Sequence, residues 1–441
     1  MNKLKGFARG LLMALVVVVG LYAWLALPWF VLLPLVLVFG AWLLLTRRGR
    51  QAASVAQVGL STLPQRIGAS SVVVVGIAGV VAVLVALLAM AEGYQDTLRK
   101  SGSEDTALVM RGASAAEVMS TLDNASVNVI SQAPGIARDA ENRPLASPEL
   151  VVAANLPLRD GGPEDEGSVQ LRGVGGQAWA VHPNVRVVDG RKFEPGRREL
   201  MAGVGAQRQF AGLTPGTVIH MGSQDWTVVG VFESGDALES ELWADAGVVA
   251  STYERGSSRT SVTVKLERAS ALKGFKAALA DDPRLDVDAK TTLEYFAEQS
   301  EVMTKVIRYV GMVVGAIMGL GAVFGALNTM FASVAARMRE IATLRAIGFR
   351  SVPVVVAVML ETMLLALAGG VLGGVLAWLV FNGFTASTMA GGVGQLTFKF
   401  HVSAPVLWTG LKWALAIGFV GGLFPAVRAA RLPVTEALRA A

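Results

Sequence analysis

The feature that most constrains this chain is a series of apolar runs, each long enough or nearly long enough to cross a lipid bilayer as a helix. A crossing helix needs about 20 mainly apolar residues, and the first two runs are at the short end of that range. Hydrophobic residues make up 53% of the chain and charged residues only 17%, as in membrane proteins. We therefore predict a polytopic α-helical membrane protein with six spans: Leu11–Leu27, Phe30–Leu45, Ser71–Ala91, Val302–Val334, Val352–Phe381 and Pro405–Leu423.

Basic clusters beside the spans predict the topology. Arginine and lysine accumulate in cytoplasmic loops, and six crossings place all of these clusters on one side with both termini in the cytoplasm. A signal peptide is the competing interpretation of the N-terminus, but a second apolar run follows the first almost at once. The clusters are the N-terminal Lys3, Lys5 and Arg9, then Arg47, Arg48 and Arg50, the segment Arg337–Arg350, and Arg428, Arg431 and Arg439.

Four regions follow from this pattern. Residues 1–50 form an extra N-terminal hairpin, and residues 51–94 an amphipathic elbow with span three. Residues 95–300 contain no span and predict an α+β extracytoplasmic domain inserted between spans three and four. Residues 301–441 carry spans four to six. Within the domain, alternation predicts strands at Val185–Val188 and Trp226–Val231, and composition predicts helices at Ala113–Leu122 and Ala269–Leu279.

The sequence shows no recognisable catalytic or metal-binding motif. There is no cysteine, and the three histidines are far apart. The acidic run Asp160–Glu166 lacks the spacing of a calcium loop and predicts a solvated loop. No G-x-x-x-x-G-K-[ST] or G-x-S-x-G motif occurs. We expect no enzyme activity, cofactor site, metal site or nucleic-acid binding in this chain.

A short charged helix is predicted at Arg337–Arg350, between two spans. At helical period one face is apolar, with Met338, Ile341, Leu344 and Ile347, and Gly348 ends the helix. Arg337, Glu340 and Arg345 lie off that face. Such a helix is suited to docking in a groove of a soluble partner. The alternative is an interfacial helix that only anchors two spans.

Two further patterns lie inside the spans. Glycines at steps of four predict close helix packing or a dimer face, since small residues let helices approach in lipid. These are Gly311, Gly315 and Gly319, and Gly369 and Gly373. Glu361 and Lys412 are charges inside spans, which usually face the bundle or each other. A contact between them is one possibility, and outward snorkelling of Lys412 is the other.

The chain resembles the MacB/FtsX-type (type VII) ABC transporter permeases, which include lipoprotein-releasing permeases. The family pattern R-x-x-E-I-G-x-L-R-A-I-G is matched except at Ala342, and a periplasmic-core pattern is matched by Asp189–Phe232. The family's ending is similar too, although Pro433 stands one place early. The matched residues are Arg337, Glu340, Ile341, Leu344, Arg345, Ala346, Ile347 and Gly348, with Arg339 between them, and Pro425, Ala426, Arg428, Ala429, Ala430, Arg431, Leu432, Glu436, Ala437, Leu438 and Arg439.

The resemblance implies a permease whose segment Ala335–Gly348 is the coupling helix seated on a separate ATPase subunit, where ATP and Mg bind. It implies pairing with a second copy or a homologous permease in the bacterial inner membrane, with the large domain in the periplasm. Three functions stay open: export or efflux, with a periplasmic adaptor as a possible partner; extraction of lipid-anchored cargo; and signalling to an extracytoplasmic hydrolase. The extra hairpin either binds a membrane partner or braces the bundle.

Overall fold

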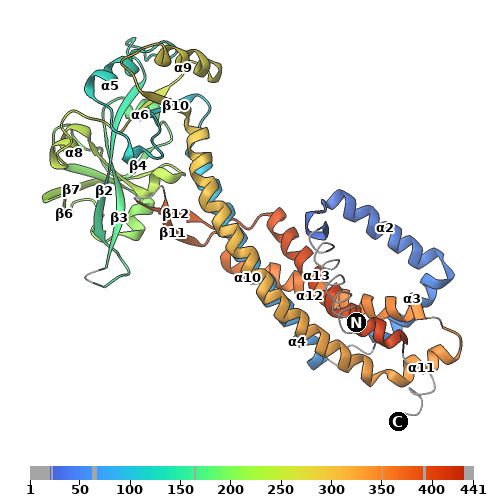
Figure 1. Ribbon diagram of the computed structural model, residues 1–441. Helices are drawn as coiled ribbons and strands as arrows, with labels where there is room; N and C mark the ends of the chain where they lie inside the picture. The colour runs from blue at the N-terminus through green and yellow to red at the C-terminus, as the bar shows by residue number, and fades with distance from the viewer. Residues whose placement is uncertain are drawn as a thin grey trace, which may run out of the picture. The chain divides into compact units, whose positions relative to one another are not determined.

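The computed structural model of the chain describes residues 20, 23–61, 67–162, 165–349, 351–390 and 394–431. The chain divides into two compact units, each continuous in space but not in sequence (Figure 1). The membrane unit comprises Met1–Met90, Ile307–Asn382 and His401–Ala441. The β-sheet unit comprises Ala91–Val306 and Gly383–Phe400.

Helices form the described part of the membrane unit. Four of them, α4, α10, α12 and α13, are long and apolar enough to cross a membrane, and a bent pair, α2 with α3, makes a fifth if it is one span. The run Leu11–Leu27 lies mostly outside the described residues, so the sixth span stays a prediction. The helices are α2 (Trp29–Leu45), α3 (Arg47–Ser61), α4 (Ile67–Lys100), α10 (Thr292–Ala336), α11 (Met338–Ala346), α12 (Ser351–Phe381) and α13 (Ala404–Arg431).

Helices α4 and α10 are longer than the spans predicted for them at the ends that belong to the β-sheet unit, and α13 ends at Arg431 rather than Leu423. Helix α4 continues nine residues beyond Ala91, and α10 begins at Thr292 rather than Val302. Polarity marks the end of an apolar run but does not stop a helix. On α4 the Asp96 and Lys100 side chains form an i,i+4 ion pair of 2.9 Å, which supports the added turns. Both helices therefore extend from the membrane unit into the β-sheet unit.

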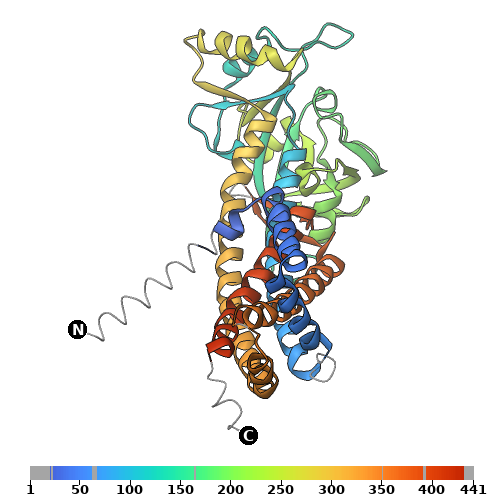
Figure 2. The same ribbon diagram turned by 90° about the vertical axis from the view of Figure 1, so that its right-hand side faces the viewer.

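Glycines set the close packing of the membrane helices seen side by side in Figure 2. A Cβ atom built on Gly311 would lie 3.1 Å from Leu87, and one on Gly315 2.9 Å from Leu84. Gly319 faces Ile417 of α13. Gly369 and Gly373 face the backbone of α4. The glycine stripes therefore pack against helices of the same chain, as the intramolecular alternative requires, and the dimer-face interpretation of these positions is not needed.

Gly369 offers a direct test of this packing. We expect Gly369→Ala to lower the free energy of unfolding by about 1–3 kcal/mol, because its Cβ would lie 2.8 Å from the Val74 carbonyl oxygen and backbone cannot yield. Gly321→Ala is the matched control, since nothing lies within 4 Å of that Cβ, and it should be neutral or stabilising. Thermal unfolding of the purified protein in detergent measures both. Equal unfolding midpoints for the two variants would contradict the packing argument.

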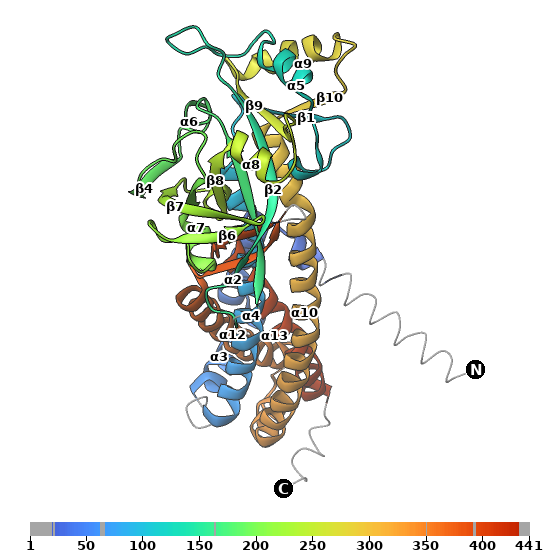
Figure 3. The same ribbon diagram turned by 90° about the vertical axis from the view of Figure 1, so that its left-hand side faces the viewer.

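A ten-stranded mixed sheet forms the β-sheet unit, in the order β10-β1-β9-β2-β3-β8-β5-β7-β4, with β6 paired to β7 (Figure 3). Both predicted strands are confirmed, as β4 and β7. The strands of this sheet are β1 (Thr106–Arg111), β2 (Ala146–Pro157), β3 (Glu166–Val174), β4 (Arg186–Gly190), β5 (Glu199–Gly203), β6 (Val218–Met221), β7 (Gln224–Glu233), β8 (Glu241–Asp245), β9 (Ser261–Lys265) and β10 (Val287–Thr291).

Short helices cover this sheet. The helix predicted at Ala269–Leu279 is confirmed as η4 and α9, but the one predicted at Ala113–Leu122 is wrong. Only the 3₁₀ turn η2 forms there, and Ala113 has φ +60°, which an α-helix does not allow. The helices are η2 (Glu117–Met119), α5 (Asn124–Ser131), α6 (Ala178–Val181), α7 (Val204–Gln209), η3 (Ala237–Ser240), α8 (Ala246–Thr252), η4 (Ala269–Ala271) and α9 (Leu272–Ala280).

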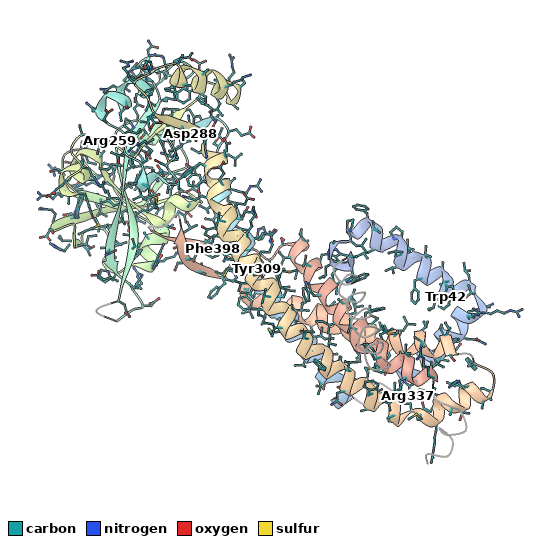
Figure 4. The ribbon with its side chains drawn as sticks, viewed as in Figure 1. Trp42, Arg259, Asp288, Tyr309, Arg337 and Phe398 are labelled. Atoms are coloured by element: carbon teal, nitrogen blue, oxygen red, sulfur yellow. The ribbon has the colours of Figure 1, made fainter. Side chains whose placement is uncertain are left out.

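A hairpin between α12 and α13 belongs to the β-sheet unit and was not predicted. Its strands β11 (Thr385–Ala390) and β12 (Gly394–Lys399) pair antiparallel. The Thr397 amide donates to Ser240 Oγ of η3 at 2.9 Å. Phe398, labelled in Figure 4, is 2% exposed and its ring meets Tyr94 edge-on at 5.6 Å. The hairpin is thus packed into this unit by a buried aromatic contact.

Candidate functional site

The site begins at the break between α10 and α11, where Arg337 leaves helical geometry with φ −106° and ψ 12°. Helix α11 is held to the bundle by two apolar contacts. Ile341 packs on a cluster from α10, α12 and α13, and Leu344 on a cluster from α3 and α12. The helix ends as predicted before Gly348, whose φ of +108° is a conformation that glycine adopts without strain.

A buried ion pair fastens this break to α12. Arg337 Nη1 lies 3.0 Å from Glu361 Oε2, with side chains 11% and 6% exposed. Arg337 Nε also donates to Glu340 Oε2 at 3.2 Å. The sequence placed Arg337 off the apolar face, but its side chain is largely buried against Glu361 of α12; Figure 4 labels its position. The reason is Glu361, which could not lie in an apolar span without a cation.

Helix α3 closes over this ion pair. A Cβ atom on Gly59 would lie 3.0 Å from Arg337 Nη1 and 3.3 Å from Glu361 Oε2, so the glycine lets the helix approach the charges. Val55 and Ala56 of α3 pack beside it on Ala357 of α12. The amphipathic segment predicted for this region is therefore the helix that packs over the Arg337–Glu361 ion pair.

The solvent side of α11 carries polar and apolar groups together. Arg339, Glu340 and Ala346 are exposed and Arg345 is half-buried. Ile347, predicted on the apolar face with Met338, Ile341 and Leu344, is 70% exposed, whereas Ile341 and Leu344 pack on the bundle. Ile347 follows Ala346, the last residue of α11, so its side chain no longer points in the direction that a continued helix would give it. An exposed isoleucine beside charged groups gives this face an apolar contact point.

The C-terminal motif that carries the family resemblance lies partly on α13. Pro425 is buried inside the helix, Arg428 lies over the Phe331 ring of α10 at 5.6 Å, and Arg431 is exposed. Glu436, Leu438 and Arg439 lie outside the described residues. The described part thus joins α13 to α10 near the start of α11.

The contact between Glu361 and Lys412 does not form. Glu361 pairs with Arg337, and Lys412 instead donates to the carbonyl of Leu25. The Trp24 indole donates back to the Lys412 carbonyl at 3.0 Å. Lys412 is 8% exposed, so it does not snorkel outward either. The N-terminal segment braces α13 here, which the bracing interpretation of the extra hairpin expects.

A second cluster of buried charges lies within the β-sheet unit around Arg172 of β3. Its guanidinium contacts Glu117 at 3.0 Å, Glu149 at 2.6 Å and Glu241 at 2.7 Å. Burial would raise the pKa of Glu149, but His182 and Arg172 outweigh it and lower the pKa to about 2. The network joins η2, β2, β3 and β8. Among the described residues no group of acidic or histidine side chains is arranged to hold a metal ion.

Helix η3 is hydrogen-bonded to several other segments of the β-sheet unit. Its N-cap Asp236 accepts from the Leu238 amide at 2.9 Å and from the Asn184 side chain. The Ala237 amide donates to Ser101 Oγ, beyond the end of α4, at 2.9 Å. Since Ser240 holds the hairpin, η3 contacts segments that lead to three membrane helices.

Asp236 should give the β-sheet unit a pH dependence. Burial raises its pKa to about 6, from an ordinary 3.8. The folded state therefore binds the proton more tightly than the unfolded state, and stability is lost as pH rises from about 4 to 6. The expected loss is about 2–3 kcal/mol. Glu149 acts oppositely but at lower pH, below about 5, so we would measure unfolding midpoints between pH 5 and 7.5, where about half of the Asp236 loss falls.

Asp236→Asn should flatten that slope, because a neutral amide carries no ionisation cost. Asp123→Asn is the matched control, an exposed N-cap of α5 that accepts from the Ser126 amide at 2.7 Å. It should leave the slope between pH 5 and 7.5 unchanged. A slope that survives in Asp236→Asn would assign the effect to another group.

Sequence reasoning identified the buried charges Glu361 and Lys412 but not their partners, and it did not identify the Arg172 cluster. Glu361 was identified as an intramembrane charge, but Arg337 is 24 residues away and no helical period joins them. Arg172 gave a signal that was not used, since a lone arginine in the apolar strand β3 needs a buried counter-charge. Gly59 gave none.

Membrane helices, a surface helix between two of them and a large sheet domain define the class: an integral membrane permease subunit with a periplasmic-type domain. Two family models match. "MacB-like periplasmic core domain" covers residues 70–282 and "FtsX-like permease C-terminal" covers residues 312–434. The chain belongs to the MacB/FtsX-type ABC transporter permease family.

Two relatives in sequence agree with this assignment. The chain is 25% identical over 364 residues to the macrolide export ATP-binding/permease protein MacB of Shewanella oneidensis, covering 73% of this chain and 54% of that protein. It is 24% identical over 295 residues to the uncharacterized ABC transporter permease YknZ of Bacillus subtilis, covering 63% and 71%. The chain thus spans about half the length of that MacB relative. The crystal structure of the periplasmic region of Actinobacillus actinomycetemcomitans MacB matches with a TM-score of 0.34 and 16% identity, over 48% of this chain and 96% of that one.

Proposed function

We propose that this chain is the transmembrane subunit of an ABC exporter and couples ATP hydrolysis in a partner subunit to movement of its β-sheet unit. The observation that carries the proposal is the buried Arg337–Glu361 pair, which ties the surface helix α11 to α12. A partner that displaces α11 would pull on α12 through a charge contact that costs too much to leave broken. Coupling of this kind needs such a shared two-state element.

The chain path supports a mechanical output. Helix α12 leads directly into the β11–β12 hairpin, and the hairpin is held by η3 and by Tyr94 of α4. A shift of α12 would thus load the β-sheet unit without opening a conduit through the membrane.

The remaining assignments belong to the same proposal. The ATP-binding subunit would hold ATP and Mg and dock on α11. A second copy of the chain would complete the transporter in the inner membrane, with both termini in the cytoplasm and the β-sheet unit in the periplasm. Export is favoured because matched relatives carry macrolide export in their names. A periplasmic adaptor would be the outer partner.

The test is loss of the ATPase from the purified complex. We expect Ile347→Asp to abolish co-purification of the ATP-binding subunit and Glu340→Ala to reduce it several-fold, because both side chains face out from α11. Gln57→Asp, exposed on α3, is the matched control and should retain the subunit. All three should keep the wild-type unfolding midpoint. Full recovery of the ATPase with Ile347→Asp would refute the docking assignment.

A further inference from the structure

The corner between α2 and α3 is tight and marks a boundary between apolar and basic surface. Thr46 Oγ1 donates to the Trp42 carbonyl and accepts from the Gly49 amide, both at 2.9 Å. A Cβ on Gly49 would lie 2.6 Å from Leu43 Cα, so the tight corner requires glycine. The two helices meet there at 92°.

Charge and exposure on the two sides of this corner are sharply different. Leu44 and Leu45 before it are 71% and 78% exposed. Arg47, Arg48 and Arg50 after it are all exposed, and no carboxylate of the described residues forms a salt bridge with them. Exposed leucines next to arginines that have no salt bridge within the described part of the chain match the change from acyl chains to headgroups at a membrane surface.

We propose that Arg47, Arg48 and Arg50 bind the headgroups of anionic phospholipids, and that this lipid contact holds α3 over the Arg337–Glu361 pair. Arginine binds a phosphate through two parallel N–H groups, and the neighbouring leucines contact the same lipid's acyl chains. The opposite end of α3 carries Gly59, which touches the pair, and Val55, which packs beside Leu344 of α11. Lipid at the corner thus stabilises the seat of α11.

Native mass spectrometry of the delipidated full chain tests the binding. We expect dioleoyl phosphatidylglycerol to bind about tenfold more tightly than dioleoyl phosphatidylcholine. The triple variant R47Q/R48Q/R50Q should lose this preference, and the triple lysine variant should keep part of it. The matched control R186Q/R198Q/R255Q removes the same charge from exposed positions of the β-sheet unit and should bind as the wild type.

Two results would overturn the binding proposal. One is an unchanged phosphatidylglycerol preference in R47Q/R48Q/R50Q. The other is displacement of the lipid by millimolar glycerol 3-phosphate, which would indicate a site for soluble phosphates instead.

Hydrogen exchange of Met338–Ala346 tests the effect on α11. In nanodiscs, phosphatidylglycerol should slow this exchange several-fold relative to phosphatidylcholine in the wild type but not in R47Q/R48Q/R50Q. Equal exchange in both lipids would refute the link to α11. The consequence for transport rests on the proposed function, but neither readout needs the ATPase, so failure of one does not imply failure of the other.

Discussion

Arg172→Met is expected to unfold or strongly destabilise the β-sheet unit, by about 5 kcal/mol. The substitution leaves the buried carboxylates of Glu117, Glu149 and Glu241 without their shared cation, and removing one partner of a single buried pair already costs about 3–5 kcal/mol. Whole domains are stable by only about 5–15 kcal/mol. Yield, protease resistance and thermal unfolding of the purified chain measure the loss.

The control for Arg172 is Arg143→Met. Arg143 also contacts two carboxylates, Asp139 at 2.9 Å and Glu141 at 3.1 Å, but its side chain is 63% exposed. Solvent replaces an exposed partner at little cost, so we expect almost no change in the free energy of unfolding. Similar losses in the two variants would mean that burial does not set the strength of the Arg172 network.

Glu361→Gln is expected to destabilise the membrane unit by about 3 kcal/mol and to loosen α11. Arg337 would stay buried with only Glu340, whose side chain is 53% exposed, as its charged partner. Unfolding in mixed detergent micelles gives the free energy, and protease cleavage near α11 reports its release.

A double-mutant cycle separates the pair from general packing. Arg337→Met combined with Glu361→Leu removes both charges and should recover most of the stability that either single change loses. Glu340→Gln, at the exposed partner, should cost less than about 1 kcal/mol. Additive losses in the double variant would show that the two charges do not depend on each other.

Local pattern predicted the elements of this fold well where one physical signal dominated. Apolar length identified the helices α4, α10, α12 and α13, and alternation identified β4 and β7. The β11–β12 hairpin was missed because its strands are short and lie between two predicted spans. Leu396 and Phe398 alternate with polar residues, so the signal was present.

The sequence could not predict which side chains contact one another between helices. Glu361 and Lys412 carry opposite charges in neighbouring helices, yet Glu361 pairs with Arg337 and Lys412 donates to the Leu25 carbonyl. Which residues face each other depends on the rotation and depth of each helix, and one sequence fixes neither. The glycine steps predicted close packing but not its partner, because the same small-residue surface serves a bundle or a dimer.

The β11–β12 hairpin has a consequence for the freedom of the β-sheet unit. This unit is entered and left twice by the chain, at residues 90–91 and 306–307 and again at 382–383 and 400–401. A body tethered at two points can swivel about the line between them, whereas four tethers remove that axis. Any motion imposed on the β-sheet unit must then be a displacement that all four connections share. Under the proposed coupling, cutting the hairpin would leave two connections and restore rotation about the line between them.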